Sequence, residues 1–362
     1  MKTIFFPDEY VVDGSYAATI GFFDGVHQGH RYLMERLKSE AQRRGLQSMV
    51  ITFDHHPRQV VQDGWQPELL TTLSEKTALI GLSGIDILVV LRFDRQMASL
   101  SARDFMQQMH DRLRVACLLT GYDNRFGHDR TECFDDYRHY GQELGMAVIG
   151  IEEHVRVGDC KDETNEGVPA VSSSYIRRLL KEGKVEAAGQ CLGHPYSLTG
   201  HVVHGEQIGR TLGFPTANLQ PDGCKLIPAD GVYAVVVDIE PPSPVKESEQ
   251  EVRKGVMNIG PRPTFDGRVR TLEVNIIDGT GNYYGKTMTV HFIARLRDER
   301  HFPSAEALAA QIKKDKQQAE ELFSRYEVRG ARCEVRGTRY EVRGARYEVR
   351  GTRCENRKNC EL

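Results

Sequence analysis

Apolar runs and helical patterns alternate along the first 151 residues of the chain. Strand-like apolar runs occupy residues 17–23, 49–53, 87–91, 117–120 and 147–151. Between them, apolar residues recur every three or four positions, for instance over 74–82, 102–113 and 133–144. Such alternation is typical of an α/β domain whose parallel sheet carries helices on both faces. Ligands of these sheets bind beyond the carboxyl ends of the strands.

The pattern changes after a seam near residues 183–195 that is punctuated by glycine and proline. Short strand-like runs then follow one another at 201–203, 232–239, 254–257, 272–277 and 288–293. Their spacing predicts a small antiparallel β-barrel, with residues 240–254 as an exposed loop and 304–323 as a closing helix. We therefore expect an α/β domain at 1–186, a barrel domain at 187–325 and a repetitive tail at 326–362.

The composition narrows the class of protein. The chain has 362 residues, of which 40% are hydrophobic, and a formal charge of −3, which fits a soluble globular protein without a basic bias toward nucleic acid. Apolar runs stay well short of the roughly 20 residues that span a bilayer, and the N-terminus lacks the features of a signal peptide. The eight cysteines form no Cys-x-x-Cys pair, so neither zinc nor a disulfide framework is expected. We expect a cytoplasmic protein that has no membrane or specific nucleic-acid partner.

The first group of candidate functional residues lies where the strand at 17–23 ends. The stretch from Thr19 to His30 breaks at the turn dipeptide Asp24-Gly25 and then enters a helical pattern. His27 and His30 would lie at the start of this helix, where unpaired N–H groups and the positive end of the dipole favour a phosphate. Two imidazoles can donate hydrogen bonds as negative charge develops at phosphorus. Local chemistry alone leaves the alternative of two incidental loop histidines.

Two further clusters fall at element ends. The loop 121–127 carries Asp123 and Arg125 between glycines. The serines 172–174 lead into a helix with Arg177 one turn inside, and together they offer hydroxyls, N–H groups and a guanidinium to phosphate. Taken alone, a solvated loop and ordinary helix capping explain these clusters equally well.

The second half carries a longer constellation of glycines and oxygen-bearing side chains. Glycines allow backbone N–H groups to face a phosphate, and a proline stiffens the turn that presents a threonine and an asparagine, whose oxygens suit magnesium. The residues are Gly205, Gly209, Arg210, Gly213, Pro215, Thr216 and Asn218. Farther on, Glu273 lies on a strand opposite to its apolar face, where a carboxylate can act as a general base. A turn-rich surface loop and an exposed glutamate are the alternatives.

Two long strings in these regions resemble one family. Gly-Phe-Phe-Asp-Gly-Val-His-Gln-Gly-His, from Gly21, resembles the FAD synthetase part of bacterial bifunctional riboflavin kinase/FAD synthetases. Gly-Arg-Thr-Leu-Gly-Phe-Pro-Thr-Ala-Asn, from Gly209, resembles the riboflavin kinase signature, and further matches start at Gly231 and Gly255. The resemblance covers about residues 1–323, with both halves in the family's order.

The resemblance implies a fold and a pair of activities. It implies a Rossmann-like nucleotidylyltransferase domain, a riboflavin kinase barrel, ATP as co-substrate, Mg²⁺ as metal, and FMN and FAD as products. His27 and His30 would stabilise the α-phosphoryl group in transfer, and Glu273 would be the base of the kinase. Thr216 and Asn218 would contact the metal, and the remaining contacts to nucleotide or substrate would be Gly21, Phe22, Asp24, Gly25, Asp123, Arg125, Ser172, Ser173, Ser174, Arg177, Gly205, Gly209, Arg210, Gly213, Pro215 and Asn258. At two positions the chain departs from the family, which often has asparagine followed by phenylalanine where this chain has Asp123 followed by Asn124.

Two other functions compete with this reading. One is an adenylyltransferase for another phosphate, such as a pantetheine or nicotinamide nucleotide, but the constellation in the barrel half would then have no use. The other is a flavin- or nucleotide-binding protein with degenerate sites, against which the intact histidines, Thr216, Asn218 and Glu273 argue.

The tail repeats every seven residues from Tyr326, in units such as Tyr-Glu-Val-Arg-Gly-Thr-Arg. A recurring glycine, which costs about 1 kcal/mol in a helix, argues against a coiled coil. The DNA word TACGAGG in tandem encodes this unit, and one A-to-G change in the word produces the observed Tyr-to-Cys and Thr-to-Ala differences. Residues 325–362 hold eleven Lys and Arg against six Asp and Glu, a net charge of +5 that leaves −8 for the rest. We interpret the tail as a translated DNA repeat that is disordered and has no catalytic role.

Deletion of residues 326–362 tests the interpretation of the tail. The truncated protein is expected to keep both activities and the melting temperature of the full chain, because no candidate site residue lies in the repeat. Chromatography of the flavin products and differential scanning calorimetry provide the two measurements. Loss of either activity, or a collapsed melting temperature, would contradict the interpretation.

Overall fold

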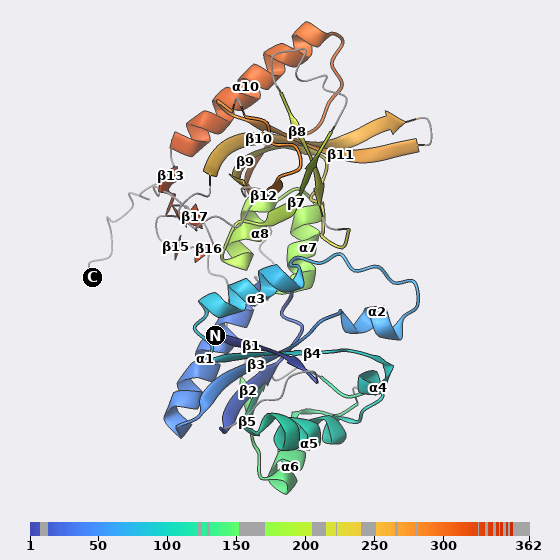
Figure 1. Ribbon diagram of the computed structural model, residues 1–362, viewed down its shortest axis with the longest axis vertical. Coiled ribbons are helices and arrows are strands. Elements are labelled where there is room, and N and C mark those ends of the chain that lie inside the picture. The colour runs from blue at the N-terminus through green and yellow to red at the C-terminus, as the bar shows by residue number, and fades with distance from the viewer. Residues whose placement is uncertain are drawn as a thin grey trace, which may run out of the picture. The chain divides into compact units, whose positions relative to one another are not determined.

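The computed structural model describes most of the chain. The described residues are 1–7, 14–121, 125–128, 131–151, 171–204, 215–221, 223–239, 251–264, 267–279 and 281–324, together with the backbone of short strands between 326 and 349. The chain divides into two compact units, Met1–Arg178 with Gly223–Leu226, and Leu179–Asp222 with Ile227–Leu362 (Figure 1). Among the described residues, no helix has both the length and the apolar character that crossing a membrane requires.

The first unit is built on a six-stranded parallel sheet, as the alternating pattern predicted. The strand order is β1-β4-β3-β2-β5-β6, and every pairing between neighbours is parallel. The strands are β1 (Lys2–Phe6), β2 (Tyr16–Ile20), β3 (Gln47–Phe53), β4 (Ile87–Leu91), β5 (Val115–Gly121) and β6 (Ala147–Ile151). The sequence analysis did not predict β1, because its apolar run at residues 4–6 has only three residues and is too short to indicate a strand; in the sheet this edge strand pairs with β4 alone.

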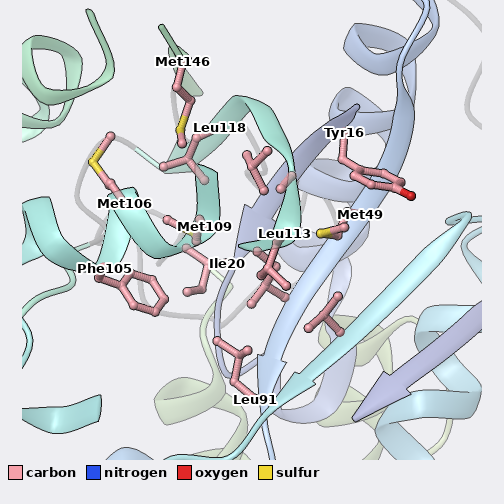
Figure 2. Close-up of a cluster of buried hydrophobic side chains, with 14 of the residues drawn as sticks. Tyr16, Ile20, Met49, Leu91, Phe105, Met106, Met109, Leu113, Leu118 and Met146 are labelled. Atoms are coloured by element: carbon pink, nitrogen blue, oxygen red, sulfur yellow. The ribbon is translucent and has the colours of Figure 1, made fainter. Parts of the chain in front are cut away.

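Helices cover both faces of this sheet. The helices α1 (Gln28–Arg44) and α3 (Leu73–Leu82) share one apolar cluster with the sheet, and α5 (Ala102–Leu113) and α6 (Phe134–Leu144) share the other. Figure 2 shows the second cluster, in which Met106 and Met109 of α5 pack toward Ile20 and Leu118 of the sheet. Because burial on both faces makes the central strands apolar throughout, these strands were the easiest to predict.

Short elements connect the sheet to these helices. They are the 3₁₀ helix η1 (Asp24–Val26), α2 (Pro57–Val61) and α4 (Arg95–Ala98). Helix α3 begins with a capping box, in which the Thr72 side chain accepts from the Glu75 N–H while the Glu75 carboxylate accepts from the Thr72 N–H. The helices α7 (Ser173–Lys181) and α8 (Val185–Leu192) follow β6 in the sequence.

The second unit contains the predicted antiparallel barrel. The barrel is closed in the order β10-β11-β8-β7-β12-β9. Its strands are β7 (Ser197–Val203), β8 (Ala217–Pro221), β9 (Gly231–Ile239), β10 (Glu251–Thr264), β11 (Gly267–Ile276) and β12 (Thr287–Arg297). Tyr233 and Phe292 meet edge-to-face in one core, with ring centroids 5.3 Å apart. Helix α10 (Ala305–Ser324) packs Ala319 and Phe323 on Val232, Ala234 and Val236, which alternate with Tyr233 and so face the other side of β9.

Three predictions for the second half and the tail need correction. No strand was predicted over β8, because its five residues, of which only Ala217 and Leu219 are apolar, give little apolar signal. The predicted loop 240–254 is wrong at its end, since Glu251 begins β10, and residues 240–250 lie outside the described part.

The tail was expected to be disordered, but its described residues form short strands. They are β13 (Tyr326–Arg329), β14 (Arg332–Val335), β15 (Thr338–Arg339), β16 (Glu341–Val342), β17 (Ala345–Arg346) and β18 (Glu348–Val349). Alternation of polar residues with tyrosine and valine suits a strand, and one glycine per unit suits a turn.

The contact between α10 and the barrel gives a stability prediction. Phe323 is almost fully buried, so Phe323→Ala should lower the free energy of unfolding of the second unit by about 3–5 kcal/mol. Lys313→Ala, at an exposed position of the same helix, is the matched control and should have little effect. Urea unfolding followed by tyrosine fluorescence measures both variants. Equal stability of the two would mean that α10 does not contribute to the barrel core.

Candidate active sites

The first candidate site begins at the carboxyl end of β2. Phe23 has the left-handed φ of 54° and Gly25 a φ of 81°, so the chain turns sharply through η1 before α1 starts. His27 is the N-cap of α1. The structure thus places His27 and His30 at the N-terminus of a helix, as predicted, with the two residues one helical turn apart.

The two imidazoles stack on each other. Their ring centroids are 3.5 Å apart with an interplanar angle of 20°. His27 Nδ1 accepts a hydrogen bond from the backbone N–H of His30 at 3.4 Å, which leaves the proton of a neutral His27 ring on Nε2. Burial lowers the pKa of His27 to about 4 and lowers the pKa of His30 as well. Both rings are therefore neutral at pH 7 and offer N–H donors without a fixed positive charge.

Asp24 is the most connected side chain of this site. It is 3% exposed, and its carboxylate accepts from the backbone N–H groups of Leu70 at 3.0 Å and of Thr71 at 2.9 Å. The Thr71 hydroxyl bonds the same carboxylate at 3.1 Å and accepts from the N–H of Gly25 at 2.9 Å. Arg177 Nη2 donates to it at 2.5 Å. Asp24 was predicted to contact nucleotide, and the structure directs its carboxylate to these protein groups.

The serine cluster and Arg177 come to the same place. The Ser173 hydroxyl donates to the Asp24 carbonyl at 2.9 Å, and Arg177 also donates to the carbonyl of Glu68 at 2.8 Å. Ser172 accepts from the N–H of Tyr175 at 3.2 Å and so caps α7. Ordinary capping, one of the two alternatives from the sequence, thus occurs at Ser172, while Ser173 and Arg177 bind protein groups. Phosphate binding by these residues stays a prediction.

A cavity of about 570 Å³ opens beside this network. Of the predicted residues, Gly21, Phe22, Arg125, Ser174 and Arg177 line it. The rest of its wall is largely aromatic or apolar and includes Phe53, His56, Trp65, Phe93, Met97, Leu100, Phe105 and Phe126. Arg58 also lines it, so a cavity that combines flat apolar walls with three arginines can hold an aromatic ring system and a phosphate.

Lys76 is a residue of this site that the sequence analysis missed. It is 2% exposed, and its ammonium donates to the carbonyls of Phe22 at 2.9 Å and Phe53 at 3.2 Å, at the ends of two adjacent strands. Burial lowers its pKa to about 8, although Asp24 and Asp54 oppose the shift. A signal was available, because Lys76 falls one helical turn before Leu79 and Ile80 on the buried face of α3.

The second candidate site is a row of polar side chains across three strands of the barrel. In the order β10-β11-β8, Asn258 pairs with Glu273, and Glu273 pairs with Asn218. Partners in a ladder point to the same face, so the three side chains form one row. Thr216 donates from its hydroxyl to the Glu273 carboxylate at 3.5 Å.

Two residues outside the predicted set support this row. Asn275, 6% exposed, donates from its side-chain amide to the Pro215 carbonyl at 2.9 Å and so fixes the entry to Thr216. Glu299 forms a side-chain hydrogen bond with Asn258, and burial raises the pKa of its carboxyl group. Pro215 and Thr216 also border a cavity of about 270 Å³ that carries Tyr283 and Tyr284.

Several predicted residues cannot be placed. Asp123, Gly205, Gly209, Arg210 and Gly213 lie outside the described residues. Their roles stay predictions. Within the described part of the chain, no cluster of three or more His, Cys, Asp or Glu side chains could hold a metal ion.

Comparison with known proteins assigns each half of the chain to a protein family. A family model of FAD synthetase matches residues 11–162, and one of riboflavin kinase matches residues 192–323. The bifunctional riboflavin kinase/FMN adenylyltransferase of Escherichia coli K12 is 37% identical over 308 residues, which cover 84% of this chain and 92% of that protein. The chain belongs to the bifunctional riboflavin kinase/FMN adenylyltransferase family.

Other members of this bifunctional family show the same extent of similarity. The Bacillus subtilis protein is 35% identical over 310 residues, 84% of this chain and 92% of its own length. The Listeria monocytogenes protein is 34% identical over 334 residues, 90% of this chain and all of its own length. A crystal structure described as a macrolide-efflux protein from Streptococcus pneumoniae has a TM-score of 0.76 and 30% identity, over 88% of this chain and 99% of that one.

The neutral histidine pair gives a pH prediction. Because the pKa of His27 is near 6.5 in the unfolded chain and about 4 in the folded one, the unfolded state binds a proton first as the pH falls. The free energy of unfolding of the first unit should therefore fall between pH 6.5 and 4, by roughly 3 kcal/mol from this residue. Titration of the His27 imidazole by NMR should show a neutral ring at pH 5.5. A midpoint near 6.5 would contradict the burial of the ring.

Proposed function

We propose that the chain makes FMN and FAD in two reactions at two separate sites. The barrel unit transfers the γ-phosphoryl group of ATP to riboflavin, which gives FMN and ADP. The first unit then joins FMN to the AMP part of a second ATP and releases pyrophosphate. The observation that carries this proposal is that each unit holds one of the two predicted constellations, within a chain that belongs to the bifunctional family.

In the proposed adenylyl transfer, a phosphate oxygen of FMN attacks the α-phosphorus of ATP. The bond from that phosphorus to the β-phosphate oxygen breaks, so no covalent enzyme intermediate is needed. Neutral His27 and His30, at the N-terminus of α1, donate N–H groups to the oxygens on which charge develops. Arg177 and Ser174 border the cavity in which the phosphates would lie, and its aromatic walls suit the ring systems.

In the proposed kinase reaction, Glu273 accepts the proton of the primary hydroxyl of riboflavin as the oxygen attacks the γ-phosphorus. Its neighbours Thr216 and Asn218 add a hydroxyl and an amide oxygen on the same face. Thr216 and Asn218 are the side chains that would hold Mg²⁺, which prefers oxygen ligands and shares them with phosphates. When bound, Mg²⁺ would neutralise charge on the β- and γ-phosphates of ATP.

The setting of the enzyme is also part of the proposal. We place it in the cytoplasm, with riboflavin, FMN and ATP as its small-molecule partners and without a specific nucleic-acid partner. The support is the composition, with a formal charge of −3 and eight cysteines that lack Cys-x-x-Cys spacing.

Two variants should separate the reactions. His27→Asn keeps a good N-cap residue but removes an imidazole donor, so FAD formation from supplied FMN should fall about 10²–10³-fold. FMN formation from riboflavin should be unchanged in this variant. Glu273→Gln should do the opposite, with FMN formation reduced about 10²–10⁴-fold and FAD formation retained.

Chromatography of flavin products from purified protein with MgATP measures both reactions. Wild-type protein that forms FMN alone would refute the proposed adenylyl transfer. Protein that binds flavin without turnover would support a degenerate binding protein, and adenylylation of another phosphate compound in place of FMN would support the rival enzyme.

A further inference from the structure

A short segment of the chain lies between two barrel strands in the sequence but packs in the first unit. Gly223–Leu226 follows β8 and precedes β9, yet it belongs to the unit that contains the parallel sheet. The N–H of Leu69 donates to the Cys224 carbonyl at 2.7 Å, and the N–H of Leu226 donates to the Leu69 carbonyl at 2.9 Å. These two bonds form a parallel bridge between Leu69 and Lys225.

The side chain of Lys225 enters the interior from this bridge. Only 1% of the side chain is exposed, and its ammonium donates to the Leu70 carbonyl and to Glu75 Oε2, both at 2.7 Å. A buried ion pair is a weak source of net stability, because desolvation of both charges offsets most of their attraction. The pair does, however, fix the position of the groups that it joins.

Leu70 and Glu75, the two residues that Lys225 binds, belong to the hydrogen-bond network around the first site. Leu70, whose carbonyl Lys225 holds, donates its own N–H to the Asp24 carboxylate at 3.0 Å. Glu75 accepts from the Thr72 N–H at 2.8 Å and so closes the capping box at the start of α3. Asp24 in turn bonds Arg177. Lys225 is thus one residue away from the carboxylate that orders the histidine loop (residues 21–30), and it is not among the residues that line the cavity.

We propose that Lys225 is a positioning residue for FMN adenylyl transfer, acting through Leu70, Glu75 and Asp24. The proposal rests on the function proposed above. A lysine that lies between two barrel strands in the sequence would thus hold the Leu70 carbonyl and Glu75 in place within the network around the adenylyltransferase site. Residues 62–72 connect α2 to α3, and within this connection Lys225 binds the carbonyl of Leu70 while Asp24 accepts from the N–H of Thr71.

The test uses the full-length protein and its two activities. Lys225→Met keeps the length of the side chain but removes the ammonium, so the segment around Leu70 loses one of its anchors. Since a displacement near 1 Å can cost about 10²-fold in rate, we expect kcat for FAD formation from FMN to fall at least about 10-fold. KM for FMN should change much less, because Lys225 does not contact the cavity. Riboflavin kinase activity of the same preparation should be unchanged and serves as the internal reference.

Three further variants make the result specific. Lys225→Arg keeps a cation that can reach both acceptors and should recover most of the kcat for FAD formation. Lys184→Met removes an exposed ion pair with Glu182 and should leave both activities unchanged. Glu75→Gln should lower kcat in the same way, and its combination with Lys225→Met should cost less than the sum of the two because both variants break one interaction.

Each outcome decides the matter. Equal loss of both activities together with a lower melting temperature in Lys225→Met would show a general structural role and overturn the proposal. Unchanged FAD formation in Lys225→Met would overturn it as well. If Lys225→Met does not fold, Glu75→Gln decides in its place by the same two activities. Wild-type protein that forms no FAD from FMN would refute the proposed function itself, and the inference with it.

Discussion

The buried carboxylate of Asp24 is the interaction on which the first site depends. It joins three segments that are far apart in the sequence, namely the turn after β2, the connection 69–72 and helix α7. Two backbone N–H groups, a hydroxyl and a guanidinium surround it, so its negative charge is balanced although the side chain is 3% exposed. These bonds hold the turn at the start of the histidine loop. Because protein groups alone supply them, they contribute to the preorganisation of the site.

The second site is ordered by a different principle. Asn218, Glu273 and Asn258 are neighbours because the backbone ladders of β8, β11 and β10 place them in one row. Their spacing follows from the pairing of strands, and it depends little on bonds between the side chains themselves. Positions on either side of Glu273 carry Leu272 and Val274, which are buried in the core. The same pairing thus sets the barrel core and the polar row.

Much of this could be predicted from the sequence, and the failures have physical causes. Central strands and amphipathic helices have a strong period, and glycine turns mark the histidine loop. The strands β1 and β8 were missed because each has five residues and too short an apolar pattern, namely three consecutive apolar residues in β1 and two separated ones in β8. Lys225 was missed because nothing near it in the sequence indicates that its ammonium will be buried, whereas Lys76 was missed although its position on the buried face of α3 was a signal. Only tertiary packing brings their acceptors together, across 54 and 155 residues of sequence for Phe22 and Leu70.

Gly223–Leu226 packs in the first unit although it lies within the sequence of the second, and this affects how such a chain can be divided or recombined. Because the first unit is discontinuous in sequence, no single cut yields both units intact. A chimaera joined after Arg178 would take the loop around Leu70 from one parent and its backbone partner Cys224 from the other. Exchange of modules between relatives therefore keeps both partners of the Lys225–Glu75 ion pair from one parent only when this four-residue insert travels with the N-terminal module, as a second crossover would allow.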